Sequence, residues 1–278
     1  MMDTHCHVQF NAFKDDSAEV IKKCADKKII LNTVGSQLDT SRRAVKFAES
    51  FDGVYATVGL HPIHLCSTEI DEEEIQFKSR EEKFDIDIYR ELAKHKKTIA
   101  IGECGLDFYH LPINMSRDEA FVLQKEAFIK QIELAQELSL PVVIHVRSAY
   151  QETIKILEEL PYKIRGVVHC YSSNWRNAEK FLSLGLHLGF TATITFPAKK
   201  TDPQIQADLI ETVQNCPLER ILTETDAPYL APQAYRGQRC EPWMVEEVVK
   251  KIAEIKKISY DKVNEITFAN ALKLFNIK

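Results

Sequence analysis

The sequence lacks long apolar runs and an excess of positive charge. No stretch approaches the ~20 consecutive apolar residues that span a bilayer, and the N-terminal MMDTHCHVQF has no basic segment leading into an apolar one. The chain carries 36 Lys and Arg against 41 Asp and Glu, a net charge of −5. We therefore expect no membrane partner. Any affinity for nucleic acid must come from a local basic patch or from bound metal ions.

The chain also has no CxxC pair, no Gly/Ser- or Pro-rich linker and no solenoid-like internal repeat. Its seven cysteines are odd in number and lie mostly in apolar or strand-like segments, which is typical of proteins from a reducing cytosol. With 45% hydrophobic and 28% charged residues, the composition is that of an ordinary globular protein. We predict one cytoplasmic domain over residues 1–278.

Short apolar runs alternate along the chain with longer segments of helical pattern. The predicted strands are 1–7, 29–34, 54–60, 98–103, 142–145, 167–169, 186–190 and 221–224. The predicted helices are 17–27, 40–50, 117–138, 151–160, 174–184, 203–215 and 242–255. Strict alternation predicts an α/β fold with a parallel sheet and outer helices. The number of strands indicates closure into a single (β/α)8 TIM barrel.

One segment interrupts this alternation. Residues 67–87 are dense in Asp, Glu and Lys, with EIDEEEIQFKSREEKFDID at 69–87. We interpret the segment as an acidic insertion after the third strand, forming a solvated helix or loop. The alternative is a lid over the site or a surface for a partner.

Histidines and carboxylates gather where the predicted strands end. The first strand ends in His5-Cys6-His7, and because side chains alternate along a strand, the two imidazoles share one face. Four further ionisable residues end or follow other strands: Glu103, His145, His169 and Asp226. A lone histidine on a strand is more often a core or surface group than a ligand. Six such residues at the active end of a barrel predict a metal site.

The residue types indicate which metals and which chemistry to expect. Imidazole and carboxylate ligands together suit Zn, Mn, Fe or Co, whereas a site made of oxygens alone would suit Mg. A carboxylate can bridge two cations about 3.5–4 Å apart, and such pairs lower the pKa of bound water. Glu103, central in strand order, is the candidate bridge. Asp226 could bind one metal and accept a proton from the water held there.

These residues lie in motifs that resemble the TatD-related DNase family of amidohydrolase-like, metal-dependent hydrolases. The matching pieces span almost the whole chain: DTHCH at 3–7, VGLHP at 58–62, IGECGLDF at 101–108, PVVIHVR at 141–147, VVHCYS at 167–172 and LTETDAPYL at 222–230. The resemblance implies a TIM-barrel metallo-deoxyribonuclease, often described as a 3′–5′ exonuclease.

The resemblance also implies roles for single residues. One metal would be held by His5, His7, Glu103 and Asp226. The second would be held by Glu103, His145 and His169. His61, in the LHP motif, would lie near the scissile phosphate. The identity of the two divalent ions stays open between Zn, Mn and Mg.

Substrate contacts are less well marked in the sequence. Arg147 is expected at the barrel mouth, where its planar guanidinium suits a phosphate, although a salt bridge to a loop carboxylate would explain it equally well. Arg236 and Arg239 follow the eighth strand, beside the usual phosphate region of such barrels. The family's late loop usually has Asn where this chain has Cys240, which leaves the substrate details of this loop open.

Three further predictions concern neighbours of these motifs. Asp107, in GLDF, could orient a ligand histidine. Tyr109 and Phe108 could stack on a base or pack in the core. The remaining histidines without a partner pattern are expected to be surface or structural groups: His95, His110 and His187.

The function that these observations favour is a metal-dependent deoxyribonuclease with a hydroxide bridging two metals, using Glu103, Asp226 and His61. We expect DNA as the partner, no organic cofactor and a monomer. One alternative is an ester or amide hydrolase on the same barrel, such as a D-aminoacyl-tRNA deacylase. Many amidohydrolase relatives bridge with a carbamylated Lys where this chain has Glu103, which favours phosphodiester chemistry. Another alternative is a barrel that binds nucleic acid or a partner without turnover.

Overall fold

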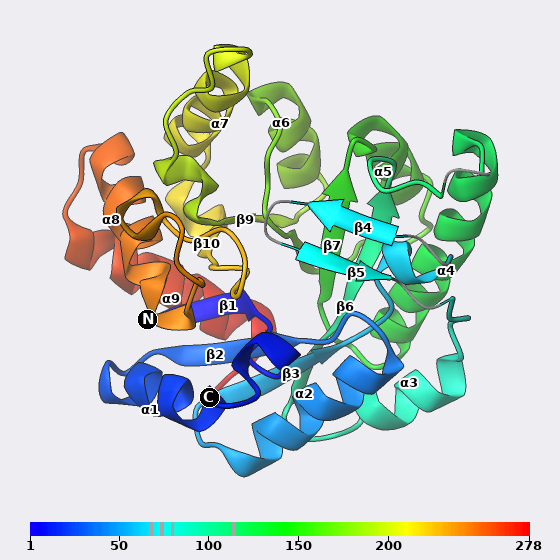
Figure 1. Ribbon diagram of the computed structural model, residues 1–278. Helices are drawn as coiled ribbons and strands as arrows, with labels where there is room; N and C mark the ends of the chain where they lie inside the picture. The colour runs from blue at the N-terminus through cyan, green and yellow to red at the C-terminus, as the bar shows by residue number, and fades with distance from the viewer. Residues whose placement is uncertain (67–68, 73–74, 79–80, 113–114) are drawn as a thin grey trace.

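Eight parallel strands form one sheet that curves into a nearly closed ring in this computed structural model (Figure 1). The structure describes residues 1–66, 69–72, 75–78, 81–112 and 115–278, with the backbone alone for 69–72 and 75–78. The strands follow the order β1 (Met2–Cys6), β2 (Ile30–Val34), β3 (Val54–Val58), β6 (Thr98–Asp107), β7 (Val142–Arg147), β8 (Gly166–Val168), β9 (His187–Phe190) and β10 (Ile221–Thr223). A parallel bridge between Cys6 and Ala227 joins the two ends of the sheet. The predicted TIM barrel is confirmed.

Helices surround the strands on the outside of the ring (Figure 1). They are α1 (Ser17–Asp26), α2 (Leu38–Ser50), α3 (Ile86–Ala93), α4 (Arg117–Glu137), α5 (Tyr150–Glu158), α6 (Trp175–Ser183), α7 (Pro203–Asn215), α8 (Val245–Lys256) and α9 (Tyr260–Phe275). Short 3-10 turns lie at Asn11–Phe13, Pro62–His64, Ala192–Thr195, Leu218–Arg220, Gln233–Tyr235 and Pro242–Met244. Within the described residues, no helix is both long and apolar enough to cross a membrane.

Two helices, α3 and α9, were not predicted. The buried face of α9 includes Thr267 and Asn270, which interrupt an apolar pattern. The Asn270 amide donates to the carbonyls of Leu218 and Ile221, at 2.8 and 2.9 Å, so a polar residue supports the barrel here. The helix α3 is short and begins within the acidic segment, which hid its pattern.

The acidic segment differs from the predicted helix or loop. Most of its described part is an antiparallel hairpin of β4 (Glu69–Glu72) and β5 (Ile75–Lys78), separate from the barrel sheet, and its last two residues begin α3. Ile70 pairs with Phe77 and Glu69 with Lys78. Apolar and polar residues alternate with a period of two in β5, whereas β4 has a single apolar residue, so the density of charge obscured the strand pattern. Residues 67–68, 73–74 and 79–80 of the predicted insertion lie outside the described residues.

The strand β6 runs four residues beyond its predicted end at Glu103. Gly102 adopts a φ of 149°, and a Cβ there would come within 2.6 Å of the Val143 carbonyl oxygen. Only glycine therefore lets β6 and β7 approach this closely. The continued pairing of the two strands carries Asp107 to the same end of the barrel as Arg147.

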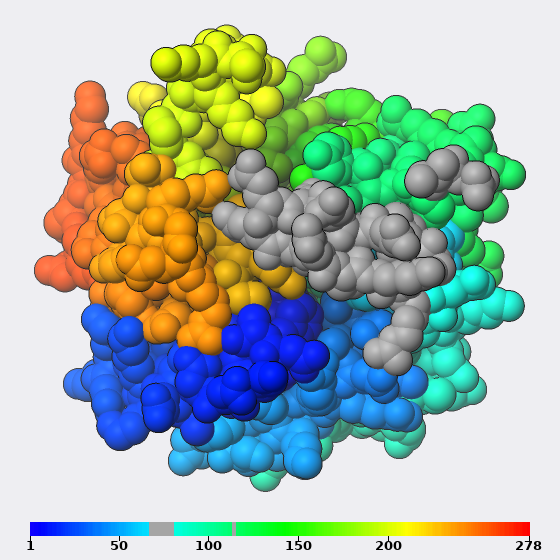
Figure 2. All heavy atoms as spheres, in the orientation of Figure 1, coloured from blue at the N-terminus to red at the C-terminus, as the bar shows by residue number. Residues whose placement is uncertain are grey.

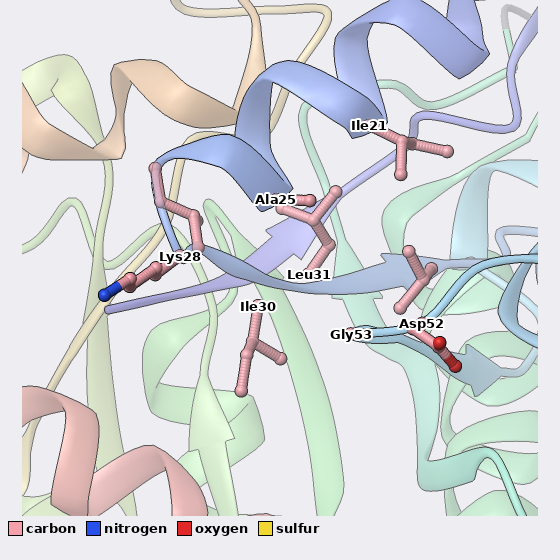
Figure 3. Close-up of a pocket in the computed structure, with 9 residues that line it drawn as sticks. Ile21, Ala25, Lys28, Ile30, Leu31, Asp52 and Gly53 are labelled. Atoms are coloured by element: carbon pink, nitrogen blue, oxygen red, sulfur yellow. The ribbon is translucent and has the colours of Figure 1, made fainter.

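The end of the barrel where the strands begin is closed by apolar packing. Met2, Val143, Val167 and Leu222 form a cluster with Ala271, Leu274 and Phe275 of α9. An open pocket of about 360 Å³ lies nearby at the starts of β2 and β3, lined by Ile21, Ala25, Lys28 and Asp52 among others (Figure 3). The polar residues of the predicted site lie at the opposite end, where the strands finish.

Candidate metal centre

The structure brings all six predicted metal ligands together at the carboxyl ends of the strands. Glu103 lies at the centre of the cluster, almost fully buried. Its Oε2 lies 3.3 Å from His5 Nε2, and its Oε1 lies 2.9 Å from His145 Nδ1. The same Oε1 lies 4.0 Å from His169 Nε2. The two carboxylate oxygens therefore face histidines from different strands.

Asp226 forms the second acidic point of the cluster. Its Oδ1 lies 3.3 Å from His7 Nε2, 3.6 Å from His169 Nε2 and 3.7 Å from His5 Nε2. Asp226 follows β10 in a left-handed conformation, with φ at 62°, and its N–H donates to the His5 carbonyl at 2.9 Å. Asp tolerates this conformation better than most residues. The turn thereby ties the last strand of the barrel to the first.

Two of the histidines, His7 and His169, each have one ring nitrogen engaged by a group that is not among the six predicted ligands. His7 Nδ1 lies 2.7 Å from the Val34 carbonyl oxygen, so it carries the proton and leaves Nε2 facing Asp226. His169 Nδ1 lies 2.8 Å from Glu224 Oε2. Metal-binding histidines usually donate their second nitrogen to a carbonyl or carboxylate in this way.

Glu224 was not identified from the sequence. It is fully buried and also accepts the Cys170 N–H at 3.0 Å and the Thr4 hydroxyl at 3.4 Å. A Cβ at Gly189 would come 2.2 Å from Glu224 Oε1, so the glycine makes room for this carboxylate. The available signal was an acid directly after the apolar strand β10, two residues before Asp226.

Asp107 organises the other side of the cluster. Its Oδ2 lies 3.2 Å from His145 Nε2 and 2.8 Å from His110 Nδ1, while its Oδ1 accepts the N–H groups of Tyr109 and His110. With Asp107 at Nε2, His145 presents Nδ1 to Glu103. His110, expected to be a surface or structural group, thus lies directly beside the site.

His61 also lies beside Glu103. Its Nε2 is 3.5 Å from Glu103 Oε1, and its Nδ1 accepts the Ile63 N–H at 3.1 Å. Since Nδ1 is the acceptor, the proton of the neutral ring resides on Nε2. Burial lowers the pKa of His61 well below its usual value, with His145 adding to the effect, so the ring is neutral at pH 7.

The two acids of the cluster are ionised. Burial alone would raise the pKa of Glu103, but His61, His5 and the other imidazoles lower it well below its ordinary value. The pKa of Asp226 is also lowered, because His169 and its neighbours outweigh the effect of burial. Both carboxylates are therefore negatively charged at neutral pH.

The imidazoles divide in their protonation. Burial lowers the pKa of His5, and the nearby His169 lowers it further. Burial alone would lower the pKa of His145, but Asp107 and Glu103 raise it to about 9. Glu224 and Asp226 likewise overcome burial and raise the pKa of His169 to about 10. At each of these rings, burial lowers the imidazole pKa and neighbouring carboxylates raise it.

The cluster fits a divalent metal. Both ring nitrogens of His5 are buried and have no hydrogen-bond partner among the described residues, which is costly unless another group occupies them. Ligand atoms lie within 4.8 Å of one another in three groups, of which the first two share His5: His5, His7 and Glu103; His5, His169 and Asp226; and His61, Asp107 and His145. Imidazole and carboxylate together suit Zn or Mn. His169 groups with His5 and Asp226 more closely than with His145.

The three predicted substrate arginines lie in different surroundings. The Arg147 guanidinium lies 4.0 Å from the centre of the Tyr109 ring, with Nη1 3.4 Å from His110 Nε2. The Arg236 guanidinium lies 4.8 Å from the centre of the Phe196 ring. Both substrate roles remain predictions.

Arg239 is held by carboxylates and a carbonyl. It pairs with both oxygens of Asp16, at 2.6 and 3.0 Å, and donates to the Ala12 carbonyl at 2.6 Å. These contacts join the loop after β10 to the loop after β1. The neighbouring Cys240 is buried, and its N–H donates to the Pro228 carbonyl at 3.0 Å. The geometry favours an anchoring role for Arg239 over phosphate binding.

Comparison with known proteins supports the sequence resemblance. A model of the TatD related DNase family matches residues 2–276. The chain is 33% identical to the uncharacterized metal-dependent hydrolase YabD of Bacillus subtilis, over 100% of this chain and 99% of that protein. It is 32% identical to the 3′-5′ ssDNA/RNA exonuclease TatD of Cronobacter sakazakii, covering 99% and 97% of the two chains.

A solved structure agrees with the fold. The crystal structure of YJJV, a TatD homologue from Escherichia coli, superposes with a TM-score of 0.81 at 27% identity, covering 100% of this chain and 98% of that one. The barrel, the strand-end cluster and these matches lead to one conclusion. The chain belongs to the TatD related DNase family of metal-dependent hydrolases.

Proposed function

We propose that this protein is a metal-dependent nuclease that hydrolyses phosphodiester bonds in DNA, as a 3′–5′ exonuclease with two divalent metal ions. The single observation that carries the proposal is the placement of Glu103. One of its oxygens faces His5 and the other faces His145, 3.3 and 2.9 Å away. A carboxylate with this arrangement can bridge two cations. The name of the Cronobacter sakazakii relative supports the choice of substrate.

The ligands proposed for the two ions are those that the family resemblance implies. The first ion would be held by His5, His7, Glu103 and Asp226. The second would be held by Glu103, His145 and His169. When bound, divalent ions of Zn, Mn or Mg lower the pKa of water and neutralise charge on a phosphate.

The chain's own groups would carry the remaining steps. Asp226, ionised at neutral pH and more exposed than Glu103, would accept the proton of the attacking water and return it to the leaving oxygen. The neutral His61 would donate its Nε2 proton as a hydrogen bond to a phosphate oxygen. Glu224 and Asp107 would keep His169 and His145 in their orientations. The buried surroundings strengthen each of these interactions.

The test is cleavage by metal-stripped protein of a 5′-labelled single-stranded DNA oligonucleotide, with Mg, Mn and Zn added back separately. We expect stepwise shortening from the 3′ end that requires metal. Glu103→Ala should lose at least 100-fold in rate, because both ions lose a shared ligand. Glu211→Gln, an exposed carboxylate on α7, is the matched control and should behave as wild type.

Two outcomes would contradict the proposal. Near wild-type turnover by Glu103→Ala with full metal content would rule out the bridging role. If wild-type protein contains metal by elemental analysis but cleaves no DNA, the nuclease proposal is rejected, whereas the assignment as a metal-dependent hydrolase stands. A D-aminoacyl-tRNA and a simple lactone would then be the next substrates.

A further inference from the structure

Tyr109 is an exposed aromatic residue directly beside the metal centre. Its side chain is 61% exposed, and it is one of four exposed large hydrophobic residues among the described positions. The other three are Val122 on α4, Ile205 on α7 and Ile258 after α8. Tyr109 alone among these lies at the carboxyl end of a barrel strand, two residues after β6.

The backbone of Tyr109 is tied to the centre through two side chains. Its N–H donates to Asp107 Oδ1 at 2.8 Å. The other oxygen of Asp107 lies 3.2 Å from His145 Nε2, and His145 Nδ1 lies 2.9 Å from Glu103. The position of the tyrosine relative to Glu103 is therefore set by hydrogen bonds, although its ring faces solvent.

Two side chains of the site, Arg147 and His110, contact the ring of Tyr109. The Arg147 guanidinium lies 4.0 Å from the ring centre, and the His110 ring meets it edge-on, with centres 4.9 Å apart at 84°. A guanidinium against one face holds the ring in place. Tyr109 remains 61% exposed beside these two groups, so a large part of the residue is accessible to a ligand. An exposed aromatic residue next to a cation matches a nucleotide, which offers a flat base and an anionic phosphate.

We propose that Tyr109 is a base-stacking platform of the substrate site, with Arg147 contacting the phosphate of the nucleotide stacked there. This inference rests on the proposed nuclease function. Stacking on an aromatic ring accepts any base, because every base has a π face. The stacked base must be unpaired, so the platform selects single-stranded nucleic acid or a frayed 3′ end. The nucleotide concerned is the terminal or the penultimate one at the 3′ end.

The test compares Tyr109→Ala and Tyr109→Phe with wild type in steady-state kinetics on a single-stranded DNA oligonucleotide. Removing the ring should raise KM about 5- to 100-fold with little change in kcat. Tyr109→Phe keeps the stacking face and should retain a wild-type KM. Val122→Ala, equally exposed but on the outside of α4, is the matched control and should change nothing.

A second pair of substrates isolates the base. Oligonucleotides carry one abasic site, at the terminal or at the penultimate 3′ nucleotide. One of these two oligonucleotides lacks the base that stacks on Tyr109. On that oligonucleotide, wild type and Tyr109→Ala should have the same KM. If Tyr109→Ala acted only by displacing Arg147, its defect would persist on both abasic substrates, and that result would overturn the inference.

The two proposals fail in distinguishable ways. Cleavage by wild type with an unchanged KM for Tyr109→Ala would reject the platform and leave the nuclease standing. No DNA cleavage by metal-loaded wild type would reject both. Duplex DNA with a blunt end gives a further check, since loss of the ring should reduce the preference for single strands over such ends.

Discussion

At the scale of single residues, the centre is defined by which nitrogen each histidine presents. His7, His145 and His169 each have one nitrogen held by a group outside the cluster: the Val34 carbonyl, Asp107 and Glu224. The ring of His5 has no such partner among the described residues. An imidazole held in one tautomer and one orientation loses less entropy when it binds a metal. We therefore expect the supporting residues to affect metal affinity as well as the proposed ligands do.

Glu224→Gln tests this support at His169. The amide has one acceptor oxygen where the carboxylate has two, so it cannot serve His169, Cys170 and Thr4 in the same way. We expect metal affinity to fall about 10- to 100-fold. Isothermal titration of the metal-stripped variant with Mn measures the change without reference to activity.

The variant His169→Ala serves as the reference, because it shows how far metal affinity falls when this proposed ligand is removed completely. The thermal midpoint of metal-free Glu224→Gln shows whether the fold itself is intact. A dissociation constant equal to that of wild type, in a folded variant, would show that Glu224 does not position His169.

At the scale of elements, the site depends on contacts between segments that are distant in sequence. The extension of β6 beyond Glu103 brings Asp107 to His145 of β7. The loop after β10 is held to the loop after β1 by Arg239 and Asp16. Loops placed in this way by a rigid barrel usually carry function. The anchoring pair therefore affects the site through the position of the loop.

A double-mutant cycle on Arg239 and Asp16 distinguishes anchoring from phosphate binding. If the pair is an anchor, Arg239→Ala and Asp16→Ala should each lower the free energy of unfolding. The double variant should lose less than their sum, with a coupling of about 1 kcal/mol or less, since the pair is partly exposed. Urea unfolding at fixed metal concentration measures the cycle.

Steady-state kinetics of DNA cleavage by the same variants test the alternative, that Arg239 binds a phosphate of the substrate. A phosphate-binding Arg239 would show a raised KM and a salt slope about one unit shallower in Arg239→Ala, but not in Asp16→Ala. Equal kinetic effects of the two single variants would confirm the anchor.

At the scale of the whole molecule, the barrel has one closed end and one polar end. The helix α9 packs Leu274 and Phe275 against the starts of the strands. The acids and histidines gather where the strands end. Figure 2 shows α8 and the loop before it packed beside the N-terminal segment on one face of the molecule. The buried charged groups at the polar end of the barrel would destabilise the fold unless they were paired or bound a metal. Metal binding should therefore stabilise the entire domain.

Removal of metal should lower the thermal midpoint. A ligand present at 100 times its dissociation constant adds about 2.7 kcal/mol. For a chain of this size we expect a shift of roughly 5–10 °C. Differential scanning calorimetry with EDTA and then with excess Mn measures it. Mn is preferred to Zn, because Zn would also bind the seven free thiols in the unfolded chain.

The variant Glu103→Ala should show a much smaller shift, and Glu211→Gln the full one. Equal midpoints with and without Mn, while elemental analysis finds bound metal, would contradict a metal site in the centre of the fold.

The alternation of apolar strands with amphipathic helices was enough to predict the barrel, and the six strand-end ligands followed from it. The reason is that the carboxyl ends of parallel strands converge on one mouth, so position along each strand decides which side chains meet. The helix α9 and the charged hairpin were missed, because polar residues interrupt the apolar pattern of the one and charged residues obscure that of the other. The contacts of Glu224, His110 and Arg239 were revealed only by the tertiary structure. Each depends on the distance between two groups far apart in the chain, and that distance exists only after the barrel has closed.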